Sequence, residues 1–277
     1  MSFNVLDMRP IEKLKNKMNI YLISLKHDEL RRNKLSVNFP KKYRYMRIIE
    51  AVNGKELSAK DYFSFLHKYY LVFKKIITPS EVGCSLSHIK ALEYFLETNE
   101  KYCLILEDDV VGSDSDISTL ENIFLNTDLK GIFILRDQSN FGFEKYIFGR
   151  KLKFFYEIPE FSVKFIFGAC SYVVDRQTAK AILDYHSKTL DIADLWYKIN
   201  KKINRKIYYY PLFIHPEDLS SSNIEEERSK FFHNKIFVKR ILDQGVFWKI
   251  FNRFRNDFYR LFLVFNGYRQ IHKDGKK

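Results

Sequence analysis

Short, nearly unbroken apolar runs that end in charged residues constrain the fold of this chain more than any other feature. The clearest are Asn19–Leu25 (NIYLISL), Tyr102–Leu106 (YCLIL) and Gly131–Leu135 (GIFIL). A strand that is apolar on both sides belongs in a sheet covered by helices on both faces. Segments of helical character, such as SLSHIKALEYFLE and RQTAKAILDYH, alternate with these runs. The alternation predicts an α/β fold with a mostly parallel central sheet.

The size and composition of the chain narrow its class further. Its 277 residues, 46% hydrophobic and 29% charged, indicate one large folded domain with an appendage. Its 3 Cys are too few and too scattered for a disulfide scaffold or a cysteine zinc site. Neither a signal-peptide core nor an 18-residue window free of charge is present, so we expect no secretory signal and no membrane-spanning helix. A cytoplasmic protein is therefore expected.

The positive charge is concentrated in residues 228–277, which hold 13 Lys and Arg against 3 Asp. Large apolar side chains recur there at spacings of three and four, which predicts an amphipathic helix. Its apolar face would comprise Phe247, Ile250, Phe251, Phe254, Phe258, Leu261, Phe262 and Phe265, with Lys249, Arg253 and Arg260 on the other side. Two interpretations stay open: a helix lying on an anionic membrane surface, or a helix packed on the core with its basic face in water. We expect an N-terminal extension (1–17), a main domain (18–227) and this tail (228–277).

Three consecutive carboxylates, Glu107, Asp108 and Asp109, directly follow the apolar run YCLIL. In an open α/β sheet, ligands bind beyond the carboxyl ends of the strands. Side chains alternate along an extended segment, so Glu107 and Asp109 should point to the same side. Two such carboxylates suit Mg²⁺ or Mn²⁺ together with substrate phosphates, and a solvated acidic turn is the alternative. His215, which follows the strand-like YYYPLFI, is a candidate further ligand.

A second candidate site is the segment GCSLSH, Gly83 to His88. Pro79 and Ser80 open a helix start, and we expect Gly83 to break the chain, so that this segment stands at a helix N-terminus whose free N–H groups attract phosphate. Ser87 and His88 would then face a bound anion. Alternatively, Ser85 or Ser87 is an ordinary helix N-cap and His88 a structural residue.

Basic residues just after the first apolar run form a third candidate site. Lys26, Arg31 and Arg32 follow NIYLISL and open a probable helix. Their charges suit a diphosphate, or contacts to a ribose or uracil. An exposed basic helix start is the alternative.

In combination, these motifs resemble glycosyltransferase family 25, the lipooligosaccharide and lipopolysaccharide biosynthesis galactosyltransferases. The matching stretches are YLISLKHDELRR, IIEAVNGKEL, ITPSEVGCSLSH and LILEDDV, with weaker similarity in GACSYVVDRQTAKAIL, DIADLW and YYPLFIHPEDLSSSNI. The resemblance covers Met18 to Ile224. It implies a GT-A fold, which is one Rossmann-like α/β domain with a metal-binding acidic motif. It also implies a UDP-sugar donor, most often UDP-galactose, with Mn²⁺ or Mg²⁺ and inversion at the sugar carbon.

The resemblance assigns metal and nucleotide roles by position. Asp109 is the expected direct metal ligand, with Glu107 and His215 as further candidates. Glu107 or Asp108 would contact the ribose or a metal-bound water.

Donor and acceptor roles follow in the same way. Ser24, Lys26 and Arg32 align with the nucleotide-side loop of the family. Asp194, in DIADLW, is the candidate catalytic base, and Asp191 is its competitor.

The implied acceptor is a lipid-linked oligosaccharide at the cytoplasmic face of the bacterial inner membrane. The tail (228–277) would then hold the enzyme peripherally at anionic lipid. Two other classes remain. A non-catalytic family member would act as a binding module in polysaccharide assembly. A nucleic-acid-binding protein would use the basic tail, but it leaves LILEDD and GCSLSH unexplained and lacks a recognition signature, so no nucleic-acid partner is expected.

Overall fold

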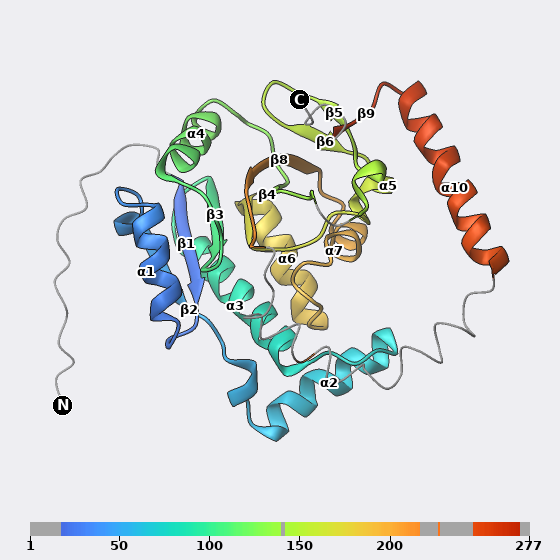
Figure 1. Cartoon of the computed structure of the whole chain (residues 1–277). Coiled ribbons are helices and arrows are strands. Elements are labelled where there is room, and N and C mark those ends of the chain that lie inside the picture. Colours follow the sequence, from blue (N-terminus) through green and yellow to red (C-terminus); the bar gives the residue numbers. More distant parts are fainter. Residues whose placement is uncertain (1–17, 140–141, 217–226, 228–245, 272–277) are drawn as a thin grey trace, which may run out of the picture.

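The apolar runs form the middle of one sheet, whose strand order is β2-β1-β3-β7-β4-β8-β6-β5-β9 among the described residues (Figure 1). A computed structural model of the chain describes residues 18–139, 142–216, 227 and 246–271, without the side chains of 246–251. The strands are β1 (Asn19–Ser24), β2 (Met46–Glu50), β3 (Tyr102–Glu107), β4 (Ile132–Arg136), β5 (Phe148–Lys151), β6 (Tyr156–Ile158), β7 (Ser171–Asp175), β8 (Ile207–Phe213) and β9 (Arg269–Gln270).

The sheet is mixed, so the prediction of a mostly parallel sheet was wrong. β1 runs parallel to β2 and β3, and β4 runs parallel to β8. β7 lies antiparallel between β3 and β4, and β6, β5 and β9 extend the sheet in antiparallel pairs. All five residues of β7 are buried, like those of the parallel strands beside it. An apolar run reports that both faces of a strand are covered, and it carries no information on the direction of the strand.

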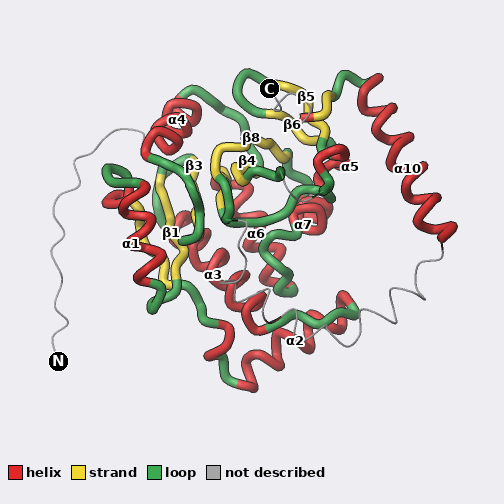
Figure 2. The backbone as a smooth tube through the Cα atoms, in the orientation of Figure 1, coloured by secondary structure: helices red, strands yellow, loops and turns green. Residues whose placement is uncertain are grey.

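Helices cover both faces of the sheet (Figure 2). They are α1 (Glu29–Asn38), α2 (Ala59–Phe73), α3 (Pro79–Leu96), α4 (Asp114–Leu125), α5 (Glu160–Val163), α6 (Arg176–Lys188), α7 (Trp196–Ile203) and α10 (Val246–Phe265). Alternate residues of β3 enter two separate cores. Cys103 and Ile105 pack with α3, α6 and α7, whereas Leu104 and Leu106 pack with α1 and α4. This sandwich fixes where β1 and β3 end, and those ends carry the candidate site.

Helix α3 begins at Pro79, as predicted, but Gly83 lies inside it rather than breaking it. The Thr78 hydroxyl accepts from the backbone N–H of Glu81, and the Glu81 carboxylate accepts from that of Thr78, which closes a capping box at the true N-terminus. Gly83 is needed for close backbone packing, because an added Cβ would lie 2.5 Å from the backbone nitrogen of Gly54. The loop that contains Gly54 therefore lies directly against α3.

The predicted tail helix corresponds to α10, and β9 after it pairs with the edge strand β5. Tyr259 stacks on Phe161 at 5.2 Å between ring centroids, and Leu263 is buried. Among the described side chains of α10, these large apolar ones are exposed: Phe254, Phe258, Leu261, Phe262, Val264 and Phe265. The predicted N-terminal extension (1–17) lies outside the described residues. At the predicted boundary between 227 and 228, residue 227 is described and residue 228 is not.

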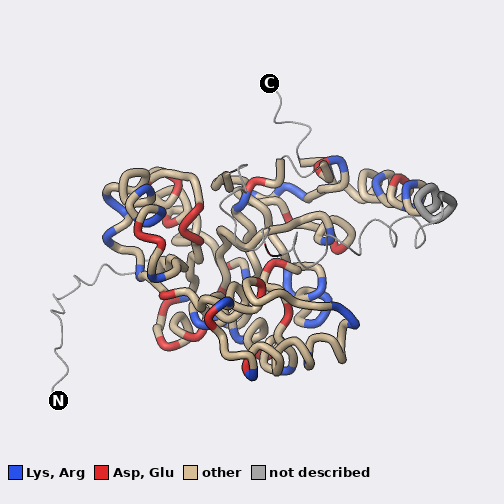
Figure 3. The backbone as a smooth tube through the Cα atoms, turned by 60° about the horizontal axis from the view of Figure 1, so that its bottom comes forward, with Lys and Arg blue, Asp and Glu red and all other residues tan. Residues whose placement is uncertain are grey.

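The charges of the described residues are mixed rather than segregated. Figure 3 shows basic and acidic positions interspersed over the body, with both signs on α10. The α10 sequence holds four Lys and Arg against one Asp, which gives it a net charge of +3. Within the described part of the chain, no helix has both the length and the apolar character that crossing a bilayer requires.

Candidate active site

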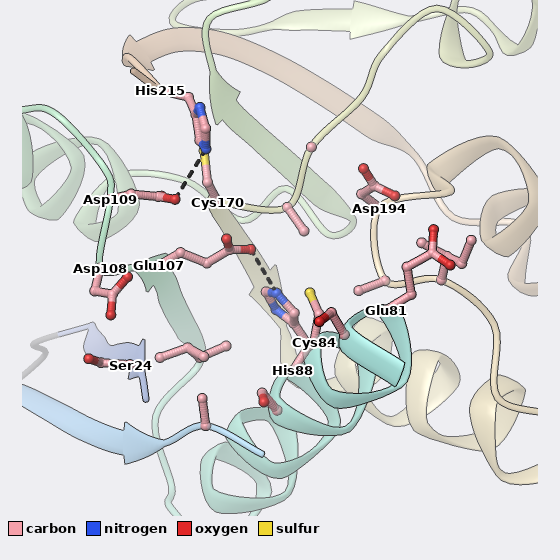
Figure 4. Close-up of a pocket in the computed structure, with 18 of the residues that line it drawn as sticks. Ser24, Glu81, Cys84, His88, Glu107, Asp108, Asp109, Cys170, Asp194 and His215 are labelled. Atoms are coloured by element: carbon pink, nitrogen blue, oxygen red, sulfur yellow. Dashed lines mark hydrogen bonds and ion pairs between the residues drawn. The ribbon is translucent and has the colours of Figure 1, made fainter. Parts of the chain in front are cut away.

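A cavity of about 540 Å³ opens at the carboxyl ends of β1 and β3. Its volume falls in the range of small-molecule sites. One end is lined by Ser24, Asp108, Asp109 and His215, and the opposite end by Glu81, Cys84 and Asp194 (Figure 4). Glu107 and His88 lie between the two ends. Strand ends and the first turns of α3 thus bring most of the sequence candidates into one cavity.

Asp109 and His215 are brought together by a short antiparallel bridge between Val111 and Ile214. His215 Nε2 lies 3.2 Å from Asp109 Oδ2. His215 Nδ1 lies 2.9 Å from the carbonyl oxygen of Pro216, to which it donates, so Nε2 is the ring nitrogen aimed at the carboxylate. A histidine fixed in this way through Nδ1 has the orientation of a metal-binding imidazole.

Electrostatics keep Asp109 ionised. Burial alone would raise its pKa, but the hydrogen bond and charge of His215, with the charges of Arg31 and Arg136, lower the pKa below its ordinary value. In return, the hydrogen bond to Asp109 raises the pKa of His215 against the effect of burial. Oδ1 of Asp109 is buried and accepts no hydrogen bond from the described residues. An ionised carboxylate with a spare buried oxygen, next to an imidazole, is a donor set that fits Mn²⁺ or Mg²⁺.

Arg31 pairs with the two aspartates of the acidic triplet. Its Nη1 donates to Asp108 Oδ1 at 3.0 Å and lies 3.7 Å from Asp109 Oδ2. Burial raises the pKa of Asp108, although hydrogen bonds from Ser24 and Arg31 oppose that shift. Arg31 also lines the cavity, so its guanidinium stands beside any anion bound there.

The other basic candidates are not placed in the cavity wall. Arg32 donates to the Ser24 hydroxyl at 2.8 Å and to the carbonyl oxygen of Lys26 at 2.8 Å, and these bonds hold the turn between β1 and α1. Ser24 lines the cavity, whereas neither Lys26 nor Arg32 is among its lining residues. Arg32 therefore acts on the cavity through the position of Ser24.

Glu107 is held by a buried chain of hydrogen bonds rather than by the Asp109–His215 pair. Tyr172 Oη lies 3.1 Å from His88 Nδ1, and His88 Nε2 lies 3.1 Å from Glu107 Oε1. Burial raises the pKa of Tyr172 well above its ordinary value, so the phenol stays protonated and donates to Nδ1. His88 then carries its proton on Nε2 and donates it to Glu107. The carboxylate of Glu107 is thereby fixed in the middle of the cavity.

Cys84, His88 and Glu107 form a second cluster whose ligand atoms lie within 4.8 Å of one another. Burial, followed by the charge of Glu107, raises the pKa of the Cys84 thiol well above its ordinary value. Of the two clusters, the Asp109–His215 pair therefore fits a divalent ion better.

The segment GCSLSH does not form a helix N-terminus, because α3 begins at Pro79. Ser85 and Ser87 donate to the carbonyl oxygens of Glu81 and Gly83, one turn back in the helix. Ser87 Oγ also accepts from the backbone N–H of Val52 at 2.8 Å. The backbone N–H groups of this segment are thus inside the helix, which removes the basis for the predicted phosphate site. Ser87 and His88 still line the cavity through their side chains.

Asp191 and Asp194 lie in the loop before α7. Asp191 is fully buried. Its carboxylate accepts from Tyr185 Oη at 2.7 Å and lies 3.3 Å from Lys198 Nζ. Asp194 lines the cavity, and Asp191 is not among the lining residues. Asp191 thus anchors the loop that presents Asp194.

Arg136 and Gly168 also line the cavity, and the sequence motifs assigned no role to either. Arg136 ends β4, and Gly168 lies beside it with φ +83°. An added Cβ on Gly168 would lie 1.9 Å from Arg136 Nη1, so only glycine leaves room for the guanidinium. The rule that polar residues at strand ends form sites would have identified Arg136, whereas the contact with Gly168 is visible only in three dimensions.

Comparison with known protein families places the chain in one of them. The family model "Glycosyltransferase family 25 (LPS biosynthesis protein)" matches residues 17–196, which is more than half of the chain. The chain therefore belongs to glycosyltransferase family 25.

Individual relatives are distant. A "Glycosyltransferase 25 family member" of Anopheles gambiae is 35% identical over 97 residues, which cover 33% of this chain and only 16% of that protein. A "Putative glycosyltransferase" of Haemophilus influenzae is 26% identical over 228 residues, 78% of each chain. The crystal structure of galactosyltransferase LgtC in complex with donor and acceptor sugar analogs is 14% identical with a TM-score of 0.32, over 70% of this chain and 62% of that one. A TM-score that low does not establish a shared fold.

Proposed function

We propose that this chain is a metal-dependent, inverting glycosyltransferase of the GT-A type. It would transfer a sugar, for which we propose galactose, from a UDP-sugar to a hydroxyl of a lipid-linked oligosaccharide. The pathway would be lipopolysaccharide, lipooligosaccharide or capsule biosynthesis. The observation that carries the proposal is the Asp109–His215 pair at the end of β3, inside a cavity of ligand size, in a member of family 25.

Asp109 and His215 would hold a Mn²⁺ or Mg²⁺ ion. When bound, the ion supplies positive charge that neutralises a departing diphosphate. The buried spare oxygen of Asp109 supports this assignment. Glu107, although a metal candidate by position, is bonded to His88, and we assign it instead to a hydroxyl of the donor.

Arg31 and Ser24 would bind the nucleotide end of the donor. Arg31 is held by Asp108 and Asp109, so its guanidinium is already oriented when an anion arrives. Ser24 is oriented by Arg32 and offers a hydroxyl to the ribose or a phosphate. Charge and preorganised hydrogen bonds together favour a diphosphate over a neutral ligand.

Asp194, across the cavity from Asp109, would be the catalytic base. In an inverting transfer, the acceptor oxygen forms a bond to the anomeric carbon as the carbon–oxygen bond to the diphosphate breaks. The electron pair of that bond leaves with UDP, and the acceptor proton passes to the carboxylate of Asp194. The burial of Asp191 and its bonds to Tyr185 and Lys198 favour Asp194 over Asp191 for this role.

The donor is tested by measuring UDP release from a panel of UDP-sugars with purified protein, with Mn²⁺ and with EDTA. We expect release from one sugar, with UDP-galactose tested first, and loss of release in EDTA. If UDP release without an acceptor is too slow to measure, UDP binding with Mn²⁺ and with EDTA tests the same metal-dependent site. Absence of both metal-dependent release and metal-dependent binding would contradict the proposed function.

The base is tested with Asp194→Asn. We expect turnover to fall by about 10²–10⁴-fold, while UDP affinity is retained because the nucleotide binds at the other end of the cavity. Asp191→Asn is the comparison, and its effect should appear as lost stability of the loop. Retained turnover in Asp194→Asn would refute the assignment.

We also propose that the enzyme binds peripherally at the inner face of the inner membrane, through residues 228–277. The exposed apolar side chains of α10 and its net charge of +3 support this location. Replacement of Phe254 and Phe258 by Ser should weaken binding to anionic vesicles. Unchanged binding would point to another anchor.

A further inference from the structure

Helix α2 carries an exposed apolar surface that the proposed reaction does not use. This surface, the α2 stripe, consists of Phe63, Tyr70, Leu71 and Val72 of the helix and of Ile76 in the turn after it, whose exposed fractions run from 39% to 63%. Other side chains of the helix are packed against the body: Tyr69 is buried, and Tyr62, Phe65, Leu66 and Phe73 pack in the same cluster. The stripe is therefore not needed to hold α2 in place.

Four lysines belong to α2 and to the turn that follows it. Lys60, Lys68, Lys74 and Lys75 are all exposed. The acidic residue of this helix, Asp61, is engaged with the Ser58 hydroxyl at its N-terminus. Lys74 ends the helix in the left-handed region at φ 54° and lies 5.7 Å from the centre of the Tyr70 ring. Positive charge thus stands directly beside the apolar side chains.

We propose that the α2 stripe and its lysines contact an anionic lipid bilayer. Protein–protein interfaces are depleted of Lys in their cores, whereas helices in a membrane interface combine large apolar side chains with Lys and Arg. Long Lys side chains keep their charge at the lipid headgroups while their stems lie along the apolar surface. Charge complementarity favours anionic over zwitterionic lipid.

The place of α2 connects this contact to the cavity. The chain enters α2 from Asn53–Gly54 and leaves it toward Ser80–Glu81, and both segments line the cavity. Glu81 lies at the same end as Asp194 in Figure 4. A bilayer against α2 would therefore lie beside the end of the cavity where the acceptor is proposed to bind. This inference rests on the proposed function, because it assumes that a lipid-linked acceptor binds at this end of the cavity.

The α2 contact adds to that of α10, because stable peripheral binding takes two membrane signals rather than one. Both helices combine exposed aromatic and aliphatic side chains with net positive charge. Removal of either contact should weaken binding without abolishing it.

The test compares flotation of variants of the full chain with vesicles of phosphatidylcholine and phosphatidylglycerol, and with vesicles of phosphatidylcholine alone. The test variant combines Phe63→Ser, Leu71→Ser and Ile76→Ser. The control combines Leu30→Ser, Val37→Ser and Leu125→Ser, which are equally apolar and exposed by 85%, 76% and 52%. We expect the test variant to lower the partition coefficient on anionic vesicles about tenfold or more, and the control to stay near wild type.

A second measurement protects the test against misfolding of the variant. Backbone hydrogen exchange in α2 of the unmodified protein should slow when anionic vesicles are added. Equal partitioning of test and control variants, or unchanged exchange in α2, would overturn the proposal. So would a self-associated wild type that the test variant converts to monomer, because the stripe would then be a protein interface.

Calorimetry with UDP and Mn²⁺ in the absence of lipid separates this proposal from the proposed function. The test variant should bind UDP like the wild type, since the α2 stripe lies outside the cavity. Absence of UDP binding by the wild type would refute the proposed function. The vesicle measurements would then decide the role of α2 on their own.

Discussion

Acidification should destabilise the loop that presents Asp194, through the buried imidazole of His186. Burial lowers the pKa of His186 to about 4, against the opposing charge of Asp191. His186 Nδ1 accepts from the backbone N–H of Asp191 at 3.3 Å, and this bond requires the neutral ring. Because the unfolded ring has a pKa near 6.5, the unfolded state binds the proton more tightly. This contribution to stability is present above about pH 6.5 and is lost as the pH falls toward 4.

The magnitude follows from the difference in pKa. A shift of about 2.5 units corresponds to about 3 kcal/mol at full protonation, and about 2–3 kcal/mol of it should be lost between about pH 7.5 and pH 4.5. The assay is urea unfolding at a series of pH values, for the wild type and for His186→Gln. Glutamine retains an acceptor for the Asp191 N–H but does not titrate.

The informative quantity is the difference between the two pH profiles, because the carboxylates of the chain contribute equally to both. On acidification from neutral pH, the free energy of unfolding of the wild type should fall by about 2–3 kcal/mol more than that of His186→Gln. Parallel profiles would refute the reasoning, since they would mean that the buried ring does not change its protonation on unfolding.

Two further predictions concern residues that contact the cavity wall from behind, Gly83 at Gly54 and Trp196 at Gly168. Gly83→Ala should cost about 1–3 kcal/mol of stability in urea unfolding and weaken UDP binding, because the new Cβ meets the backbone at Gly54; an unchanged midpoint would show that the loop yields freely. Trp196→Phe should cost about 1–3 kcal/mol, because the indole N–H that donates to the Gly168 carbonyl at 3.0 Å is lost. A stability within 0.5 kcal/mol of wild type, the usual range for a neutral surface change, would contradict the second expectation.

The positions of the strands could be predicted from the sequence, but their directions could not. NIYLISL and YCLIL became β1 and β3 because unbroken apolar character requires burial on both faces. β7 has the same character but runs antiparallel, since direction depends on how the chain returns to the sheet. The sequence predicted a break at Gly83 because glycine is a poor helix former. The close contact between Gly83 and Gly54 belongs to the tertiary structure, so local sequence could not predict it.

The candidate site could be predicted where strand ends determine it. Asp109 and His215 both follow strands, and the structure places them 3.2 Å apart. Asp191 and Asp194 occur in one short segment, so their sequence neighbourhood could not rank them. Burial separates them, because Asp191 packs with Tyr185 and Lys198 while Asp194 lines the cavity.

The most direct test of the central claim is calorimetry of UDP binding to the wild type and to Asp109→Asn, with Mn²⁺ and with EDTA. Asp128→Asn is a matched control, because Asp128 is a fully exposed carboxylate paired with Lys101. The Asp109–His215 assignment predicts Mn²⁺-dependent UDP binding in the wild type and in Asp128→Asn, and its loss in Asp109→Asn. Equal UDP affinity in EDTA, or undiminished Mn²⁺-dependent binding by Asp109→Asn, would contradict it.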